Sequence, residues 1–70
     1  MEKEYVQSSN IEAIGYDEDT QTLRVWFLNG SEYDYSGVGR LEYEALRDAP
    51  SVGSYLHQNI KGQYPYEKVG

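Results

Sequence analysis

The side chains that could take part in chemistry are few, and their spacing fits no catalytic or metal-binding pattern. His57 is the only histidine and cysteine is absent, which excludes metal clusters built on histidine and zinc sites built on thiolates. A catalytic role for His57 would need a nucleophile and an orienting acid placed by the fold, so a position on a helix surface or a half-buried one is favoured. We expect no catalytic residues, no metal site and no cofactor.

Three further segments match known motifs only in part. Asp17-Glu18-Asp19 lacks the glycine and the distal glutamate of a calcium loop, and it is interpreted as a solvated turn. Gly37-Val38-Gly39 lacks the third glycine and the lysine of a phosphate-binding loop, which favours a flexible connection between a strand and a helix. Asn29-Gly30-Ser31 matches a glycosylation acceptor but falls in a predicted tight hairpin. The 12 carboxylates make some close pair inevitable, so a glycosidase-like pair is not inferred.

The chain is unusually rich in aromatic residues, with eight tyrosines, one tryptophan and one phenylalanine in 70 residues. Aromatic rings beside basic side chains can stack on nucleobases or nucleotides. The alternative is that tyrosines are the large core residues of a chain with one phenylalanine. The candidate binding residues are Trp26, Arg40, Lys61, Tyr64, Tyr66 and Lys68.

Length and charge limit the classes of function. Seventy residues leave room for one core, with which a deep catalytic cleft would compete. The net charge is -6, which opposes the neutralisation of phosphates behind most nucleic-acid affinity, so DNA is not an expected partner. The first 35 residues hold eight acids and two bases, whereas the remainder holds four of each. Any contact with a polyanion is therefore expected in the second half of the chain.

The hydropathy of the chain predicts no association with a membrane. No window approaches the roughly 18 apolar residues of a membrane span. Residues 1–10 contain no apolar run of signal-peptide length. A cytoplasmic location is expected.

The predicted sheet begins with two strands separated by an acidic turn. Residues 11–16 alternate weakly, which puts Ile11 and Ala13 on one face and the apolar residues that follow on the other. Residues 22–28 are rich in strand-forming residues and are predicted as the second strand. The two faces of this strand are Leu23, Val25 and Phe27 on one side and Arg24, Trp26 and Leu28 on the other.

Asn29-Gly30 predicts a hairpin into a third strand at residues 31–35. A two-residue turn would place carboxylates beside the apolar side chains of the second strand. That face could then not be buried as part of a core. A three-residue loop with Gly30 in a left-handed bulge instead places tyrosines there. We therefore predict that Tyr33 and Tyr35 face the core, Tyr33 opposite Val25 and Tyr35 opposite Leu23.

Two helices are predicted after the third strand. Residues 38–49 show apolar residues at helical spacing, and Pro50 ends the run. Ser51 is placed to cap a second, shorter helix, and Gly62 is placed to stop it. The expected apolar positions are Val38, Leu41, Ala45, Leu46 and Ala49 in the first helix and Val52, Tyr55, Leu56 and Ile60 in the second.

The last segment completes the predicted fold. Residues 63–66 are extended because proline restricts the residue before it, either as an edge strand or as a docked tail. The predicted class is α+β. In it a three-stranded antiparallel sheet, with a short C-terminal segment as an optional fourth strand, packs against one or two helices.

A series of short segments runs along nearly the whole chain: Ser8-Ser9-Asn10-Ile11, Gly15-Tyr16, Leu23-x-Val25-x-Phe27, Gly30, Tyr33-x-Tyr35, Gly37-Val38, Ala49-Pro50-Ser51-x-Gly53, Asn59-Ile60 and Tyr64. Together they resemble the KTSC domain, a family named for the C-terminus of some lysyl-tRNA synthetases. Tyr33-Asp34-Tyr35 matches the YxY motif of that family. The resemblance covers about residues 8–66, so residues 1–70 are expected to form a single KTSC-like domain.

The resemblance implies a fold more than a function. The family occurs as an appendage and as small stand-alone bacterial or phage proteins, and RNA binding has been suggested from the synthetase association. The first interpretation is a non-catalytic binding or interaction module for a protein, a nucleotide or RNA. One alternative is RNA or tRNA binding through the second half of the chain, with bases on phosphates and tyrosines stacking. Another is a small-nucleotide sponge or a phage-host protein contact.

Overall fold

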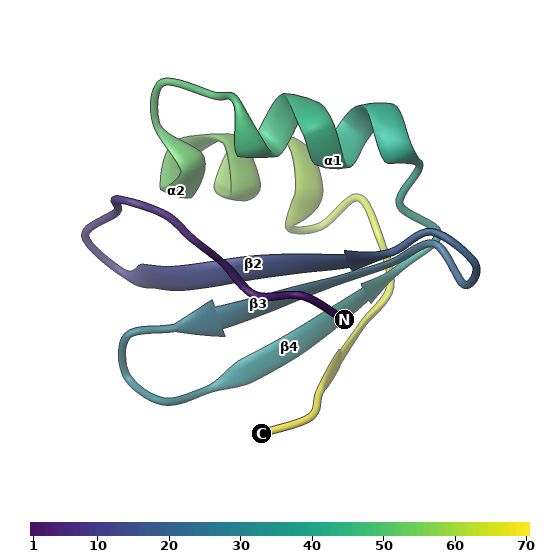
Figure 1. Ribbon diagram of the computed structural model, residues 1–70, viewed down its shortest axis with the longest axis horizontal. Helices are drawn as coiled ribbons and strands as arrows, with labels where there is room; N and C mark the ends of the chain where they lie inside the picture. The colour runs from purple at the N-terminus through teal and green to yellow at the C-terminus, as the bar shows by residue number, and fades with distance from the viewer.

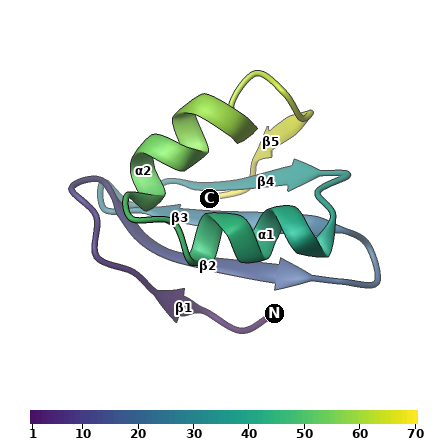
Figure 2. The same cartoon turned by 90° about the horizontal axis from the view of Figure 1, so that it is seen from above.

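The computed structural model describes residues 1–70 and shows a five-stranded antiparallel sheet with the helical segments on one of its faces (Figures 1 and 2). The strands lie in the sheet in the order of the sequence, and the helical segments join the fourth strand to the fifth. The elements are β1 (Glu4–Tyr5), β2 (Ile11–Asp17), β3 (Thr22–Phe27), β4 (Glu32–Ser36), α1 (Arg40–Arg47), α2 (Val52–Tyr55), the π-helical turn η1 (Leu56–Ile60) and β5 (Tyr66–Lys68).

The α+β class is confirmed, but the predicted number of strands is too low. The three expected strands are the centre of the sheet, and β1 and β5 extend it on either side. Both added strands are short and all of their residues are exposed, so they lack the apolar alternation by which strands are recognised in a sequence. β5 also begins at Tyr66, where the predicted extended segment ends. Backbone pairing with a neighbouring strand, rather than burial, defines these two edges.

The β3–β4 hairpin has the predicted bulged register. Val25 lies opposite Tyr33 and Leu23 lies opposite Tyr35. The loop closes with the Gly30 N–H donating to the Phe27 carbonyl at 3.0 Å, and Gly30 has a φ of +93°. Glycine adopts this backbone conformation without steric cost. The register places the helix-facing side chains of both strands on one apolar surface.

A bulge in β2 corrects the expected alternation of this strand. The pairing with β3 shifts between Ile11 and Ala13, so these two residues lie on opposite faces rather than on the same one. Ile11 and Ile14 both join the core, although three positions separate them. An extra residue in one strand reverses the faces beyond it. The weak alternation of this segment is explained by the bulge.

The helix α1 is rotated relative to its predicted apolar stripe. Tyr43 stacks on Tyr16, with ring centroids 4.9 Å apart and an angle of 10° between the rings, and Leu46 is completely buried. This rotation leaves Leu41 81% exposed and also exposes Ala45, so the prediction that they face the sheet is wrong. The stacking of Tyr43 on Tyr16 sets the orientation of the helix, rather than the predicted stripe of smaller apolar residues.

The second helical segment follows its predicted pattern. The Ser51 side chain accepts a hydrogen bond from the Ser54 N–H at 3.3 Å, as expected of a helix cap. Val52, Leu56 and Ile60 are buried on one stripe. The last turn is wider than α-helical, since the backbone N–H five residues beyond Leu56 donates to its carbonyl at 2.8 Å. None of the helices is long and apolar enough to cross a membrane.

The outer face of the sheet, opposite the helices, is partly covered by the N-terminal residues. The Lys3 ammonium lies 5.0 Å from the centre of the Trp26 ring, and the side chain of Trp26 is half-buried. Arg24 and Asp34 form an ion pair with two hydrogen bonds at 2.7 and 2.9 Å on neighbouring strands. Trp26 therefore lies on the face opposite the helices, as the alternation of β3 predicts.

Gly15 allows this close approach, and its replacement is a test of it. A Cβ atom at Gly15 would lie 2.8 Å from the backbone oxygen of Glu2 and 3.0 Å from the Trp26 ring. Gly15→Ala is therefore expected to lower the free energy of unfolding by about 1–3 kcal/mol, measured by urea denaturation. In the control Gly39→Ala the new methyl meets no atom within 4 Å, and only a weaker helix start is expected. Equal losses in the two variants would contradict this packing.

Candidate functional site

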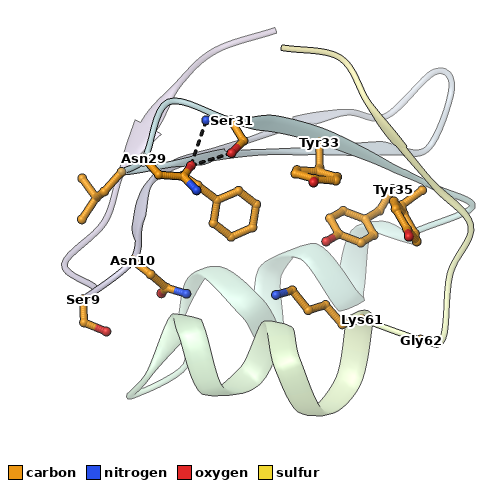
Figure 3. A pocket seen from close by; sticks show the side chains of 11 residues that line it. Ser9, Asn10, Asn29, Ser31, Tyr33, Tyr35, Lys61 and Gly62 are labelled. Atoms are coloured by element: carbon orange, nitrogen blue, oxygen red, sulfur yellow. Dashed lines mark hydrogen bonds between the residues drawn. The ribbon is translucent and has the colours of Figure 1, made fainter.

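A cavity of about 720 Å³ opens on the helix side of the sheet, between the β3–β4 hairpin and the end of η1 (Figure 3). Its aromatic lining consists of Phe27, Tyr33, Tyr35 and Tyr66, and we call it the aromatic cavity. Small-molecule sites in proteins commonly have volumes of about 300–1,000 Å³ and a mostly apolar lining with a few polar groups. The volume of this cavity falls within that range, and its lining combines aromatic rings with several polar groups.

Strand alternation and strand pairing bring the four rings together. The bulged hairpin directs Tyr33 and Tyr35 to the helix side, and β5 places Tyr66 directly opposite Tyr35. The Phe27 and Tyr33 rings meet edge to face with centroids 5.7 Å apart. The Tyr66 ring lies 5.9 Å from the ring of Tyr33 and 6.1 Å from that of Tyr35. The rings thus form a continuous aromatic surface.

The rings differ in exposure, which gives the cavity a fixed base and an open side. Tyr35 is 3% exposed and belongs to the core, Tyr33 is half-buried against the core, and Tyr66 is 65% exposed. Burial raises the pKa of the Tyr35 hydroxyl, and the neighbouring Tyr33 and Tyr66 raise it further. The hydroxyl of Tyr35 therefore stays protonated at neutral pH and can donate a hydrogen bond.

Lys61 supplies the only charged side chain of the cavity. It follows η1 directly, and its ammonium lies 5.5 Å from the centre of the Phe27 ring. Lys61 takes part in no ion pair of the structure, whereas Lys3 and the three arginines each do. No carboxylate lines the aromatic cavity, although the chain carries 12. The cavity is thus a locally cationic site on an acidic protein.

Two asparagines complete the polar lining. Asn10 lies in the loop before β2, and Asn29 lies in the hairpin loop (Figure 3). The Asn29 side-chain oxygen accepts hydrogen bonds from the Ser31 N–H at 3.0 Å and from the Ser31 hydroxyl at 2.5 Å. These contacts fix the asparagine at the edge of the cavity.

The structure brings only part of the predicted binding set together. Lys61 and Tyr66 line the aromatic cavity. Lys68 lies beside it on β5, paired with Tyr33, and is in no ion pair. These three residues share one region of the surface.

The other predicted binding residues lie outside the cavity, and each contacts other side chains of the protein. Arg40 binds Glu18 at 2.7 Å and Glu44 at 3.1 Å, so its charge is already neutralised within the protein. The hydroxyl of Tyr64 donates to the Glu42 carboxylate at 3.2 Å, and Trp26 lies on the outer face of the sheet. These three residues do not extend the cavity.

Sequence reasoning did not single out Asn10, Asn29 or Phe27 as binding residues. Asn10 and Phe27 belong to the segments that carry the family resemblance, and this membership was the only signal in the sequence that could have identified them. Asn29 belongs to a segment that matched only a glycosylation acceptor motif, and that motif gives no indication of a ligand site. Their presence in one lining depends on the contact between the loop before β2 and the β3–β4 hairpin, which are distant in sequence.

Other chemistry-bearing side chains form no site. His57 is exposed on η1, in agreement with its interpretation as a surface residue. The acidic turn after β2 is solvated, with the Asp19 N–H donating to the Asp17 carboxylate at 3.0 Å. No group of three or more histidine, cysteine, aspartate or glutamate residues is placed to hold a metal ion.

Comparisons with known proteins agree on one family. Residues 7–64 match the family model of the KTSC domain. A lysine–tRNA ligase of Nostoc sp. is 44% identical over 90% of this chain, and the matched part is 11% of that ligase. An uncharacterised protein of Stutzerimonas stutzeri is 36% identical over 99% of both chains. The crystal structure of a KTSC domain protein from Yersinia pestis matches with a TM-score of 0.92 and 34% identity, over 99% of this chain and 97% of that one.

Proposed function

The chain belongs to the KTSC domain family, and we propose that it is a non-catalytic binding module whose ligand occupies the aromatic cavity. One observation carries this proposal. An open cavity of about 720 Å³ combines four aromatic rings with one unpaired lysine and no carboxylate. Several residues of the family resemblance, among them Asn10, Phe27 and the two tyrosines of the YxY motif, lie in this lining.

The chemistry of the lining supports binding rather than catalysis. Its polar groups are amides, hydroxyls and one ammonium, with no histidine or carboxylate to act as a general base. The hydroxyl of Ser31 donates to the Asn29 side chain, so it is not paired with a base that could make it a nucleophile. The cavity can therefore hold a ligand without a group placed to transform it.

Binding of single-stranded RNA or tRNA is the second candidate. The observation in its favour is that Lys61, Lys68 and Tyr66 share one region, where bases and phosphates could be contacted together. Relatives named as lysine–tRNA ligases point the same way, although this chain spans only 11% of their length. The net charge of -6 and the neutralised Arg40 oppose it. Two free lysines predict weak binding with a shallow dependence on salt.

An NMR-detected screen tests both candidates. Isotope-labelled protein would be titrated with a small-molecule library and, at low salt, with short single-stranded RNA. We expect a ligand whose shift changes centre on Tyr33, Tyr35 and Lys61, and Tyr66→Ala should weaken it while leaving the fold intact, because Tyr66 is exposed on an edge strand.

The matched control is Trp26→Ala, which removes an aromatic ring from the outer face of the sheet. It should leave the affinity of such a ligand unchanged. Shift changes centred on Trp26, or turnover of a library compound that a single substitution abolishes, would contradict the proposed function. A ligand that proves to be a protein or a free nucleotide at the cavity would support it.

A further inference from the structure

Asn29 presents an unpartnered amide donor to the aromatic cavity. A backbone N–H can only donate, so the bond from the Ser31 N–H identifies the accepting atom of Asn29 as its side-chain oxygen. The side-chain nitrogen of Asn29 is then left without a partner in the structure. Figure 3 shows this nitrogen on the side of the amide that faces the cavity.

Asn10 presents a second amide donor, and hydrogen bonding again fixes its orientation. The Ser8 hydroxyl oxygen accepts from the backbone N–H groups of Asn10 and Ile11, both at 3.3 Å. With its lone pairs occupied, this hydroxyl donates its hydrogen to the Asn10 side-chain oxygen at 3.1 Å. The side-chain nitrogen of Asn10 therefore has no partner and points into the cavity (Figure 3).

The loop that carries Asn10 is held in place by its surroundings. The Asn10 carbonyl accepts a hydrogen bond from the Leu28 N–H at 2.8 Å, which joins the loop to the hairpin. On the other side the loop packs against α2 at Gly53, where a Cβ atom would come within 3.1 Å of the Asn10 side-chain oxygen. The donor is thus positioned before any ligand arrives, which lowers the entropic cost of binding.

Lys61 reaches the same space from the opposite side. In Figure 3 the ammonium of Lys61 and the amide nitrogen of Asn10 extend toward each other across the cavity. The wide turn η1 sets the origin of this side chain, because the Lys61 N–H donates to the Leu56 carbonyl at 2.8 Å. Three sets of N–H donors thus surround one space whose lining includes no carboxylate, a suitable arrangement for the oxygens of an anion.

The charge balance limits how much negative charge this space accepts. One lysine lines the cavity, and the protein as a whole carries a charge of -6. A single negative charge is neutralised by Lys61, whereas a second one would be repelled by the acidic protein. The aromatic lining in turn favours a planar ring, which can stack on Tyr33 and Tyr66.

We propose that the aromatic cavity binds a small planar aromatic compound with one negative charge, held between Lys61 and the amide groups of Asn10 and Asn29. The anionic group is a carboxylate or a phosphodiester, since both present oxygen acceptors and carry one charge. This inference rests on the proposed function, of which it names the ligand class.

Isothermal titration calorimetry with matched probes tests the ligand class. The monoanions are indole-3-carboxylate and 3′,5′-cyclic AMP, which represent the carboxylate and the phosphodiester, and the uncharged partners are indole-3-carboxamide and adenosine. We expect at least one monoanion to bind about ten- to a hundredfold more tightly than its uncharged partner. Lys61→Met, which keeps the apolar stem, should remove this difference. The control Lys3→Met changes the net charge equally on the outer face of the sheet and should leave it unchanged.

The outcomes separate this inference from the proposed function. Equal binding of charged and uncharged probes at the cavity would overturn the inference and leave a binding module. Equal effects of Lys61→Met and Lys3→Met would also overturn it, because general electrostatics would then explain the preference. Binding of RNA without binding of either monoanion, or binding of none of the probes, would overturn it as well, while the library screen decides the proposed function independently.

Discussion

Tyr35→Ala is expected to lower the free energy of unfolding by about 3–5 kcal/mol, a loss comparable with the total stability of a domain this small. Tyr35 is 3% exposed, lies opposite Leu23 in the sheet and belongs to the main core cluster. Removal of its ring leaves a void that the two flanking strands cannot close, because their backbones are paired. Urea or thermal denaturation would measure the loss.

Two control variants identify the part of the side chain that is responsible. The hydroxyls of Tyr16, Tyr55 and Tyr64 form hydrogen bonds in the structure, whereas that of Tyr35 does not. Tyr35→Phe should therefore stay within about 1 kcal/mol of the unchanged protein. Trp26→Ala removes a larger ring from the outer face, where the side chain is only half-buried, and should cost less than Tyr35→Ala. If Tyr35→Phe were as unstable as Tyr35→Ala, the role assigned to the ring would be wrong.

Alkaline pH is expected to destabilise the protein, beginning near pH 10. Five tyrosines have a pKa above the ordinary value of about 10, and for four of them burial is the largest cause. For Tyr55 the largest cause is the hydrogen bond to Glu42. Since these hydroxyls ionise at lower pH in the unfolded chain than in the folded protein, their contribution to stability is complete below about pH 10 and is lost as the pH rises through the folded values.

Urea denaturation between about pH 8 and about pH 11, together with phenolate absorbance, would measure this loss. Glu42→Gln is the informative variant, because the carboxylate of Glu42 accepts hydrogen bonds from both Tyr55 and Tyr64. Without that carboxylate the pKa of Tyr55 should fall toward its ordinary value, and the alkaline loss of stability should become smaller. A free energy of unfolding that is constant over this pH range would contradict the prediction.

The parts of the fold that could be predicted are those determined by neighbouring residues. The hairpin register follows from Asn29-Gly30 and from the requirement that carboxylates avoid the apolar face. The stripe of the second helical segment follows from the spacing of Val52, Leu56 and Ile60. In both cases the information lies within about ten residues of sequence, which is the range over which periodicity operates.

The parts that could not be predicted depend on contacts between distant segments. The orientation of α1 is set by the Tyr16–Tyr43 stack, which no local pattern shows. The edge strands are defined by partners rather than by composition. The aromatic cavity has the same origin, because Asn10, Asn29 and Lys61 come from three connections that meet only in the folded protein. The sequence shows which residue types these connections carry, but it does not show that the three side chains meet at one cavity.

The short strand β5 makes access to the cavity a property of local dynamics. Tyr66 is held by three residue pairs between β4 and β5, and all three residues of β5 are exposed. Such edges open and close with free energies well below that of global unfolding, so their amides exchange with solvent while the core remains protected. Each opening of β5 would move Tyr66 away from the fixed ring of Tyr35 and widen the entrance. The rates at which a ligand enters and leaves would then be set by the motion of the C-terminal residues rather than by the rigid sheet.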